Sequence, residues 1–409
     1  MREKLERLML PGHYDARYVQ VADGLRALSV FIVAWFHIWQ QSWLNPVLSI
    51  GPVRLDFNAP VRTGYMMVDM MLLLSGFLLF LPYARARVNG APLPDTRTYF
   101  IKRALRILPS YWLCLLVMLF VFDLPGHEYG SWRHFLLDFF GHLTFTHNLT
   151  AEGYIGTRLN GVLWTLAVEG QFYLIAPLLG RAFVKKPILT YAGMLGVAFM
   201  YRFVYVAGMQ DTALYFNRLP AMLDVYANGM LFAWLYTAMK KRLKPDWRTG
   251  SLALVLCVAA LAAVWLLMDM QSHRYGTEEV RMGQMIYRFP LSLAGGVFLA
   301  VGSQAPGWFQ WLWSNRLMRF IAGISCNLYI WHQHLALRLR AWHIPPYADE
   351  MPQRAGEQPW QTQYTWLCFA GAVARALPGH GEGIALDAAI SARRREALRE
   401  ALEGLGIFV

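Results

Sequence analysis

The sequence predicts an all-α polytopic membrane protein with about ten transmembrane helices, and three observations support this prediction. Of the 409 residues, 56% are hydrophobic and only 16% are charged, whereas soluble proteins are about one quarter charged. The mean hydropathy is +0.31. The apolar residues are gathered in long runs separated by polar segments, and runs of this length cross a bilayer as helices.

Ten segments are long and apolar enough to span a bilayer, or nearly so. In chain order, they cover residues 25–44, 64–83, 107–124, 162–183, 187–207, 219–239, 250–270, 284–304, 319–337 and 359–378. Clusters of Lys and Arg follow every second segment, which gives about twenty on one side before the tail and roughly ten on the other. Because these residues are enriched on the cytoplasmic side, we expect both termini in the cytoplasm, N-in and C-in.

The ends of the chain and its cysteines carry further expectations. Residues 1–378 are expected to form one transmembrane domain, and residues 379–409 a cytoplasmic tail that is amphipathic or irregular. Residues 1–22 lack the apolar core of a signal peptide, so the chain is expected to insert through its own helices. The four cysteines lie far apart in apolar runs, as expected of buried side chains. No nucleic-acid partner is expected, because the net charge of +12 follows from the cytoplasmic clusters.

Two ionisable side chains, Arg26 and His37, lie in the first apolar segment and its N-terminal edge. At about 100° per residue, eleven positions return a helix to within roughly 20° of its starting direction, so both project from one face. They stand roughly 16 Å apart along the axis, about half of a bilayer core. One interpretation is an arginine that reaches the headgroups and a packed histidine. The other is a functional pair.

Charged side chains also occur in the second and third segments. A carboxylate at the depth of Asp69 requires a partner or a function, whereas the Ser75-Gly76 step is explained by close helix packing. Arg103 and Arg106 mark the inner entrance of the third segment and are neighbours on a helix. Such a pair matches phosphate oxygens by bidentate hydrogen bonds, although ordinary cytoplasmic arginines give the same pattern.

The fourth and ninth segments add an acid, hydroxyl groups and an imidazole. Glu169 is the only acid in its segment, with Thr165 one turn before it; a buried glutamate paired with an arginine is the structural alternative. Ser325, Tyr329 and His332 fall on one helical face. Three further intramembrane charges are expected to neutralise one another: Arg202, Asp224 and Arg288.

The long outer segment between the third and fourth spans contains three metal-ligand side chains at helical spacing, His134, Asp138 and His142. Aromatic and leucine residues surround them, which favours an interfacial or re-entrant helix at the outer surface. Because no Cys or Glu partner and no outer-shell group accompany them, no metal is expected.

The order of these motifs resembles the acyltransferase-3 family of bacterial membrane acyltransferases. The resemblance rests on Asp-Gly-Leu-Arg…His, Val-Asp…Leu-Ser-Gly-Phe, Arg-x-x-Arg-Ile-x-Pro, Leu-Trp-x-Leu-x-Val-Glu-x-Gln-Phe-Tyr and Ile-Ser…Leu-Tyr-x-Trp-His, spread over residues 23–332. It implies ten helices in the bacterial inner membrane, in a transmembrane acyltransferase domain. It also implies transfer of an acyl group, often acetyl from acetyl-CoA, to a hydroxyl of a carbohydrate-containing acceptor such as O-antigen, exopolysaccharide or peptidoglycan.

By position, the family's Arg-x(10)-His motif falls on Arg26 and His37, its Arg-x-x-Arg motif on Arg103 and Arg106, and its membrane glutamate on Glu169. The three arginines are expected to bind the phosphates of acyl-CoA, the co-substrate, and no permanently bound cofactor is expected. His37 is expected to act as general base, because an imidazole titrates near neutral pH and can take a hydroxyl proton.

The other candidates have supporting parts. Glu169 is expected to orient the imidazole or the acceptor, and Tyr329 or Thr165 to donate to the developing oxyanion. Asp69 and His332 are further supporting candidates.

Three positions and the tail depart from the family's pattern. Thr165 stands where Ser is frequent, Gly170 where Glu is common and Cys326 where Tyr is usual. Family members commonly close with a Glu-(Lys/Arg)-Pro element that this chain lacks. Residues 379–409 are therefore either a divergent end or the product of a frameshift.

Two other functions are alternatives to acyl transfer. A transporter or flippase for a polar or lipid-linked molecule would line its path with these charges, but the sequence has no inverted repeats or broken half-helices at matched positions. A cytochrome-b-like haem protein would use His37 and His332. Acyl transfer makes its own geometric prediction: Arg26, Arg103 and Arg106 cluster at one mouth of a cavity that contains His37.

Overall fold

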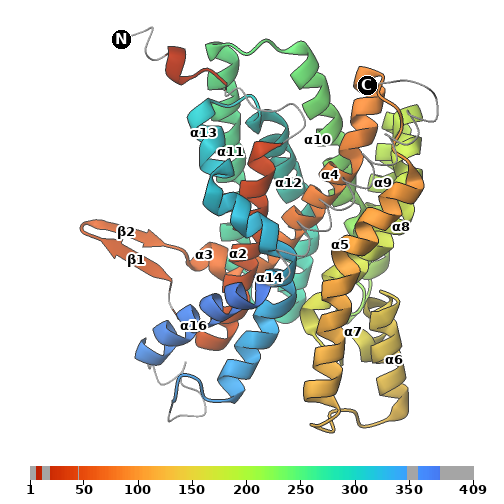
Figure 1. The fold of residues 1–409 in the computed structure, drawn as a ribbon, viewed down its shortest axis with the longest axis vertical. Helices are drawn as coiled ribbons and strands as arrows, with labels where there is room; N and C mark the ends of the chain where they lie inside the picture. Colours follow the sequence, from red (N-terminus) through yellow and green to blue (C-terminus); the bar gives the residue numbers. More distant parts are fainter. Residues whose placement is uncertain (1–5, 12–18, 45, 348–357, 378–409) are drawn as a thin grey trace, which may run out of the picture.

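The computed structural model describes residues 6–11, 19–44, 46–347 and 358–377. Within these ranges the regular structure is helical apart from one short hairpin, so the predicted all-α class is confirmed (Figure 1). Seven helices of the described residues are long and apolar enough to cross a membrane. The chain is a multi-pass membrane protein. The predicted tail, residues 379–409, lies outside the described residues.

Ten helices coincide with the ten predicted segments. In chain order they are α2 (Gln20–Ser42), α4 (Met67–Asn89), α5 (Thr96–Val117), α8 (Trp164–Lys185), α9 (Pro187–Phe199), α10 (Leu223–Arg242), α11 (Trp247–Ser272), α12 (Thr277–Gly302), α14 (Arg316–Ala341) and α16 (Gln358–Ala376). Within the described ranges, α10, α14 and α16 are not among the seven candidate spans. Charged residues at the ends of α10 and α14 reduce their apolar length.

Shorter elements connect these helices. They are the antiparallel strands β1 (Val47–Ile50) and β2 (Val53–Asp56), the helices α3 (Asn58–Arg62), α6 (Trp132–Leu143), α7 (Ala151–Tyr154) and α13 (Gly307–Ser314), and the single-turn or π segments η1 (Gly64–Met66), η2 (Met118–Asp123), η3 (His147–Leu149), η4 (Gly161–Leu163), η5 (Met200–Val206) and η6 (Leu219–Met222). Of these, α6 matches the helix predicted in the long outer segment, and the hairpin was not predicted.

The third long helix begins well before the predicted residue 107. The side chain of Asp95 accepts a hydrogen bond from the backbone N–H of Thr98 at 2.7 Å and so caps α5. Arg103 and Arg106 therefore lie inside the helix, two to three turns from its start, rather than at its entrance. Hydropathy locates the apolar stretch, whereas the cap and the first polar turns decide where the helix begins.

Figure 1 shows α5 to α9 on one side of the molecule and α2, α3, α11, α13, α14 and α16 on the other. The contact between α4 and α10 depends on small residues. A Cβ added to Gly76 would come within 2.8 Å of the Tyr226 carbonyl oxygen, and one added to Gly229 within 2.5 Å of the Leu73 carbonyl oxygen. The packing interpretation of the Ser75-Gly76 step is confirmed at Gly76.

Candidate active site

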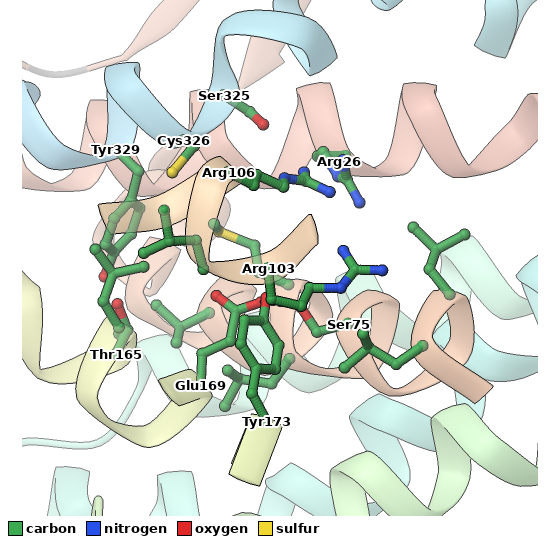
Figure 2. Close-up of a pocket in the computed structure, with 17 residues that line it drawn as sticks. Arg26, Ser75, Arg103, Arg106, Thr165, Glu169, Tyr173, Ser325, Cys326 and Tyr329 are labelled. Carbon is green, nitrogen blue, oxygen red and sulfur yellow. Dashed lines mark hydrogen bonds between the residues drawn. The ribbon is translucent and has the colours of Figure 1, made fainter. Parts of the chain in front are cut away.

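Helices α2, α4, α5, α8 and α14 surround a cavity into which three arginine side chains project (Figure 2). Arg26 comes from α2, and Arg103 and Arg106 come from successive turns of α5. The guanidinium groups of Arg26 and Arg106 point toward each other, and that of Arg103 lies nearby. The structure thus brings together the three arginines of two separate motifs, in what we call the arginine cavity.

Positive charge is in excess in the arginine cavity. Among the described residues, no carboxylate lies within 4.0 Å of a guanidinium nitrogen of Arg26 or Arg103. The Arg103 guanidinium instead lies 5.9 Å from the ring centroids of Tyr99 and Tyr173, and its Nε is buried without a hydrogen-bond partner in the described chain. Guanidinium groups in this state are suited to an anionic ligand such as a phosphate.

Glu169 is the acid that lines the arginine cavity. Its Oε1 accepts a hydrogen bond from Ser75 Oγ at 2.5 Å and another from the Tyr173 hydroxyl. Thr165, one turn earlier on α8, also lines the cavity and donates to the Val162 carbonyl oxygen at 3.2 Å. The glutamate is thus held by two hydroxyl groups. Among the described residues, Glu169 forms no direct ion pair with an arginine, which was the structural alternative.

His37 lies in a second cavity, not in the arginine cavity as predicted. This His37 cavity is formed by the C-terminal half of α2, the starts of α4, α8 and α12, and the loop before η6. Its lining includes Phe36, His37, Tyr65, Trp164, Arg281 and Gln284. The prediction of one cavity that contains all four residues is therefore wrong. The periodicity of α2 places Arg26 and His37 on one face, but it does not reveal which side chains of other helices stand between them.

The two cavities meet at Tyr329 of α14 and Val68 of α4, because these two residues line both. The Tyr329 hydroxyl donates a hydrogen bond to the Val162 carbonyl oxygen at 3.2 Å. The two cavities therefore adjoin at Tyr329 and Val68, with the arginines in one and His37 in the other.

The His37 imidazole is held from two helices. Its Nδ1 lies 3.0 Å from Gln40 Oε1 and 3.1 Å from Gln333 Nε2. Donation from Nδ1 to Gln40 requires the proton on Nδ1 and leaves Nε2 free to accept a proton, whereas a hydrogen bond from the Gln333 amide to Nδ1 requires the opposite tautomer. The buried His332 ring lies 5.1 Å from that of His37, and Glu169 makes its hydrogen bonds elsewhere. Among the described residues, Glu169 therefore makes no contact that would orient the His37 imidazole directly.

Asp69 lines neither cavity and belongs to a buried ion pair. Its Oδ1 lies 3.1 Å from Arg288 Nε, and both side chains are fully buried. Arg202 pairs with Asp224 at 2.5 Å, so mutual neutralisation is confirmed for these two, whereas Arg288 is neutralised by Asp69. Asp69 thus has the partner that a carboxylate at this depth requires.

Replacing Asp69 with alanine is expected to reduce the free energy of unfolding by about 3–5 kcal/mol, because Arg288 is left buried without its counter-charge. Detergent-induced unfolding followed by tryptophan fluorescence measures this change. The matched control is Asp211→Ala, since Asp211 also pairs with an arginine, at 3.0 Å, but is 74% exposed. A loss for Asp69→Ala no larger than the control's would contradict the structural assignment.

The candidate metal ligands of α6 have other partners. His142 Nδ1 lies 2.8 Å from the Asp138 backbone carbonyl oxygen, and Asp138 Oδ2 accepts a hydrogen bond from the Tyr129 hydroxyl at 3.0 Å. The His142 ring stacks on that of His147 at 3.6 Å. His134 Nε2 instead lies 2.8 Å from the Gly156 carbonyl oxygen. Within the described ranges, no group of three or more His, Cys, Asp or Glu side chains is arranged to hold a metal ion. Burial and the neighbouring His142 ring hold the pKa of His147 well below its usual value.

The sequence does not single out two residues that line the arginine cavity, Ser75 and Tyr173, or two that contact His37, Gln40 and Gln333. Ser75 and Gln333 bond to residues on other helices, so no local pattern reveals them. The i, i+3 spacing of His37 and Gln40 and the i, i+4 spacing of Glu169 and Tyr173 were the available signals.

Comparison with known proteins places the chain in a family. The acyltransferase domain model of the acyltransferase-3 family matches residues 20–374. The chain is 26% identical over 330 residues to a protein of Acidianus two-tailed virus named as an acetyltransferase, covering 80% of this chain and 86% of the viral one. It is 25% identical over 341 residues to the peptidoglycan O-acetyltransferase OatA of Listeria monocytogenes, covering 78% of this chain and 49% of that protein.

The chain thus spans about half the length of the peptidoglycan relative. Nodulation protein 10 of Rhizobium leguminosarum is 30% identical over 172 residues, which cover 38% of this chain and 43% of that one. No solved structure matches. The family match covers nearly the whole described chain, with membrane-spanning helices and the family's motif residues gathered at two adjoining cavities, and it shows that the chain belongs to the acyltransferase-3 family of O-acetyltransferases.

Proposed function

We propose that this chain transfers an acyl group from acyl-CoA to a hydroxyl of a carbohydrate or glycosylated acceptor, and that the acyl group is acetyl. The observation that carries the proposal is the convergence of Arg26, Arg103 and Arg106 on one cavity where, among the described residues, two of them lack an ion-paired carboxylate. Coenzyme A carries phosphates, and guanidinium groups bind phosphate oxygens in pairs. The relatives named as O-acetyltransferases support the same reaction.

The orientation that fits this function has both termini in the cytoplasm and ten helices across the bacterial inner membrane. It follows from the distribution of Lys and Arg between the loops. In this orientation the arginine cavity lies toward the cytoplasm, where acyl-CoA is made, because Arg103 and Arg106 lie in the N-terminal half of α5. The His37 cavity lies toward the outside, because it is lined by the first turns of α4, α8 and α12.

The reaction uses residues of both cavities. The arm of CoA extends from the arginines past Tyr329 and brings the thioester carbon to His37. The acceptor hydroxyl oxygen attacks this carbon while His37 Nε2 takes the hydroxyl proton. The carbon–sulfur bond then breaks, and the leaving thiolate takes the proton from the imidazole. The hydroxyl of Tyr329 or Thr165 turns from the Val162 carbonyl oxygen and donates to the developing oxyanion. Glu169 lies on the donor side, held by hydrogen bonds from Ser75 and Tyr173.

The test is transfer of labelled acetyl from acetyl-CoA by the purified full chain in lipid nanodiscs. Peptidoglycan fragments, O-antigen and exopolysaccharide serve as acceptors. We expect label in one of these glycans and release of free CoA in equal amount. Label in none of them, with no CoA released above the protein-free control, would contradict the proposed function.

A further inference from the structure

An apolar groove lies on the flank of the molecule between α2, α4, α11 and α12. It has a volume of about 310 Å³, and every residue that lines it is apolar. Its α2 side extends from Leu25 to Trp35, about 15 Å along the helix axis and half the thickness of a bilayer core. Phe31 and Trp265 at its edges are exposed, so this flank groove opens toward the surrounding hydrocarbon. Its shape and chemistry suit a hydrocarbon chain.

The flank groove and the His37 cavity adjoin on two helices. On α2, Trp35 lines the groove, and the next two residues line the His37 cavity. On α4, Met67 lines the groove, and the next residue, Val68, lines the His37 cavity. Tyr65 stands between the two spaces. Its ring lines the His37 cavity, and its hydroxyl accepts a hydrogen bond at 2.7 Å from Gln271, three residues after the groove residue Met268.

Two arginines flank Tyr65 at this junction. Arg62 ends α3, three residues before Tyr65, and Arg274 follows α11, three residues after the Gln271 whose amide donates to the Tyr65 hydroxyl. Neither pairs with a carboxylate of the described residues. Arg62 lies 6.0 Å from the Trp39 ring, and Arg274 Nε is buried without a hydrogen-bond partner in the described chain. Guanidinium groups placed in this way suit a phosphate.

From this arrangement we infer that the acceptor is presented on a phosphate-linked lipid carrier. The hydrocarbon chain of the carrier occupies the flank groove, and its phosphate lies at Arg62 and Arg274. The carbohydrate beyond the phosphate then enters the His37 cavity, where Arg281 and Gln284 offer hydrogen-bond groups. A bilayer phospholipid explains the groove but not its junction with the His37 cavity. The inference rests on the proposed function, because it names the class of acceptor for the same site.

The experiment uses the purified full chain in nanodiscs and farnesyl phosphate with a diazirine in its chain. We expect light-dependent labelling of α2 or α11 peptides that line the groove. Ala260→Trp, which fills the groove, is expected to reduce labelling at least tenfold. The matched control Val255→Trp on the same helix, 63% exposed and outside the groove, is expected to leave labelling unchanged. Equal labelling of both variants would overturn the inference.

The phosphate site is tested separately, with variants that do not fill the groove. Arg62→Gln and Arg274→Gln are expected to reduce labelling by farnesyl phosphate several-fold and to leave labelling by diazirine-farnesol unchanged. If diazirine-labelled phosphatidylglycerol competes as well as farnesyl phosphate, the groove holds bilayer lipid and the inference fails.

Binding of acetyl-CoA is measured on the same variants to separate the two proposals. We expect unchanged donor binding in the groove variants, which also shows that they fold. Loss of labelling with normal transfer to soluble glycans would overturn the lipid carrier alone. Normal labelling without any transfer from acetyl-CoA would instead overturn the proposed function.

Discussion

His37→Ala is expected to reduce the rate of acetyl transfer by about 10²- to 10⁴-fold, which is the usual contribution of a positioned general base. The imidazole lines the cavity proposed for the acceptor, and its Nδ1 contact with Gln40 leaves Nε2 able to take a proton. The measurement is labelled product formed per minute from acetyl-CoA at saturating donor. Because chemistry rather than donor binding is affected, binding of acetyl-CoA is expected to remain unchanged.

The matched control for this substitution is His334→Ala. His334 is also a buried histidine, its ring lies 4.7 Å from that of Phe122, and it lines neither cavity. Its replacement is expected to affect stability more than turnover. If His37→Ala retains more than half of the native rate in correctly inserted protein, His37 is not the base.

Single replacement of Arg26, Arg103 or Arg106 with alanine is expected to raise the KM for acetyl-CoA by about 10- to 100-fold. Each guanidinium makes charge-assisted hydrogen bonds with phosphate, worth about 1.5–3 kcal/mol, and about 1.4 kcal/mol is tenfold in affinity. Initial rates over a range of donor concentrations measure the change. With a dephospho-CoA thioester as donor, replacing the arginine that binds the missing phosphate is expected to leave the KM unchanged, because that arginine has no phosphate to bind.

Lys102→Ala is the matched control for the arginine variants. Lys102 lies next to Arg103 on α5 and carries the same charge, but it is exposed and does not line the arginine cavity. Its replacement is expected to change KM less than twofold, since the general attraction of an exposed cation is screened. Equal effects of Lys102→Ala and Arg103→Ala would indicate a diffuse surface charge in place of a phosphate site.

The membrane helices were predictable because hydropathy is a local property of the sequence. Each of the ten predicted segments coincides with a helix, and the apolar runs alone indicate where the helices lie. Their ends were less predictable. The start of α5 depends on the Asp95 cap, and the charged ends of α10 and α14 belong to the helices although they lower the hydropathy.

The candidate residues were predictable for a different reason. Ionisable groups at membrane depth are rare and costly, so each of them draws attention in an apolar sequence. This identified Arg26, His37 and Glu169, but it also drew Asp69 into the set of supporting residues. Only the packing of α4 against α12 shows that Asp69 has Arg288 as its counter-charge.

The membrane-spanning class, the family motifs and the residue types that carry the chemistry are all readable from the order of the amino acids. How these residues are distributed between two cavities depends on the packing of the helices. Arg26 and His37 are on one helix, but they line different cavities, which adjoin at Tyr329 from α14 and Val68 from α4. Contacts between helices join residues far apart in the chain, as with Ser75 and Glu169, and local periodicity contains no information about which helix faces which.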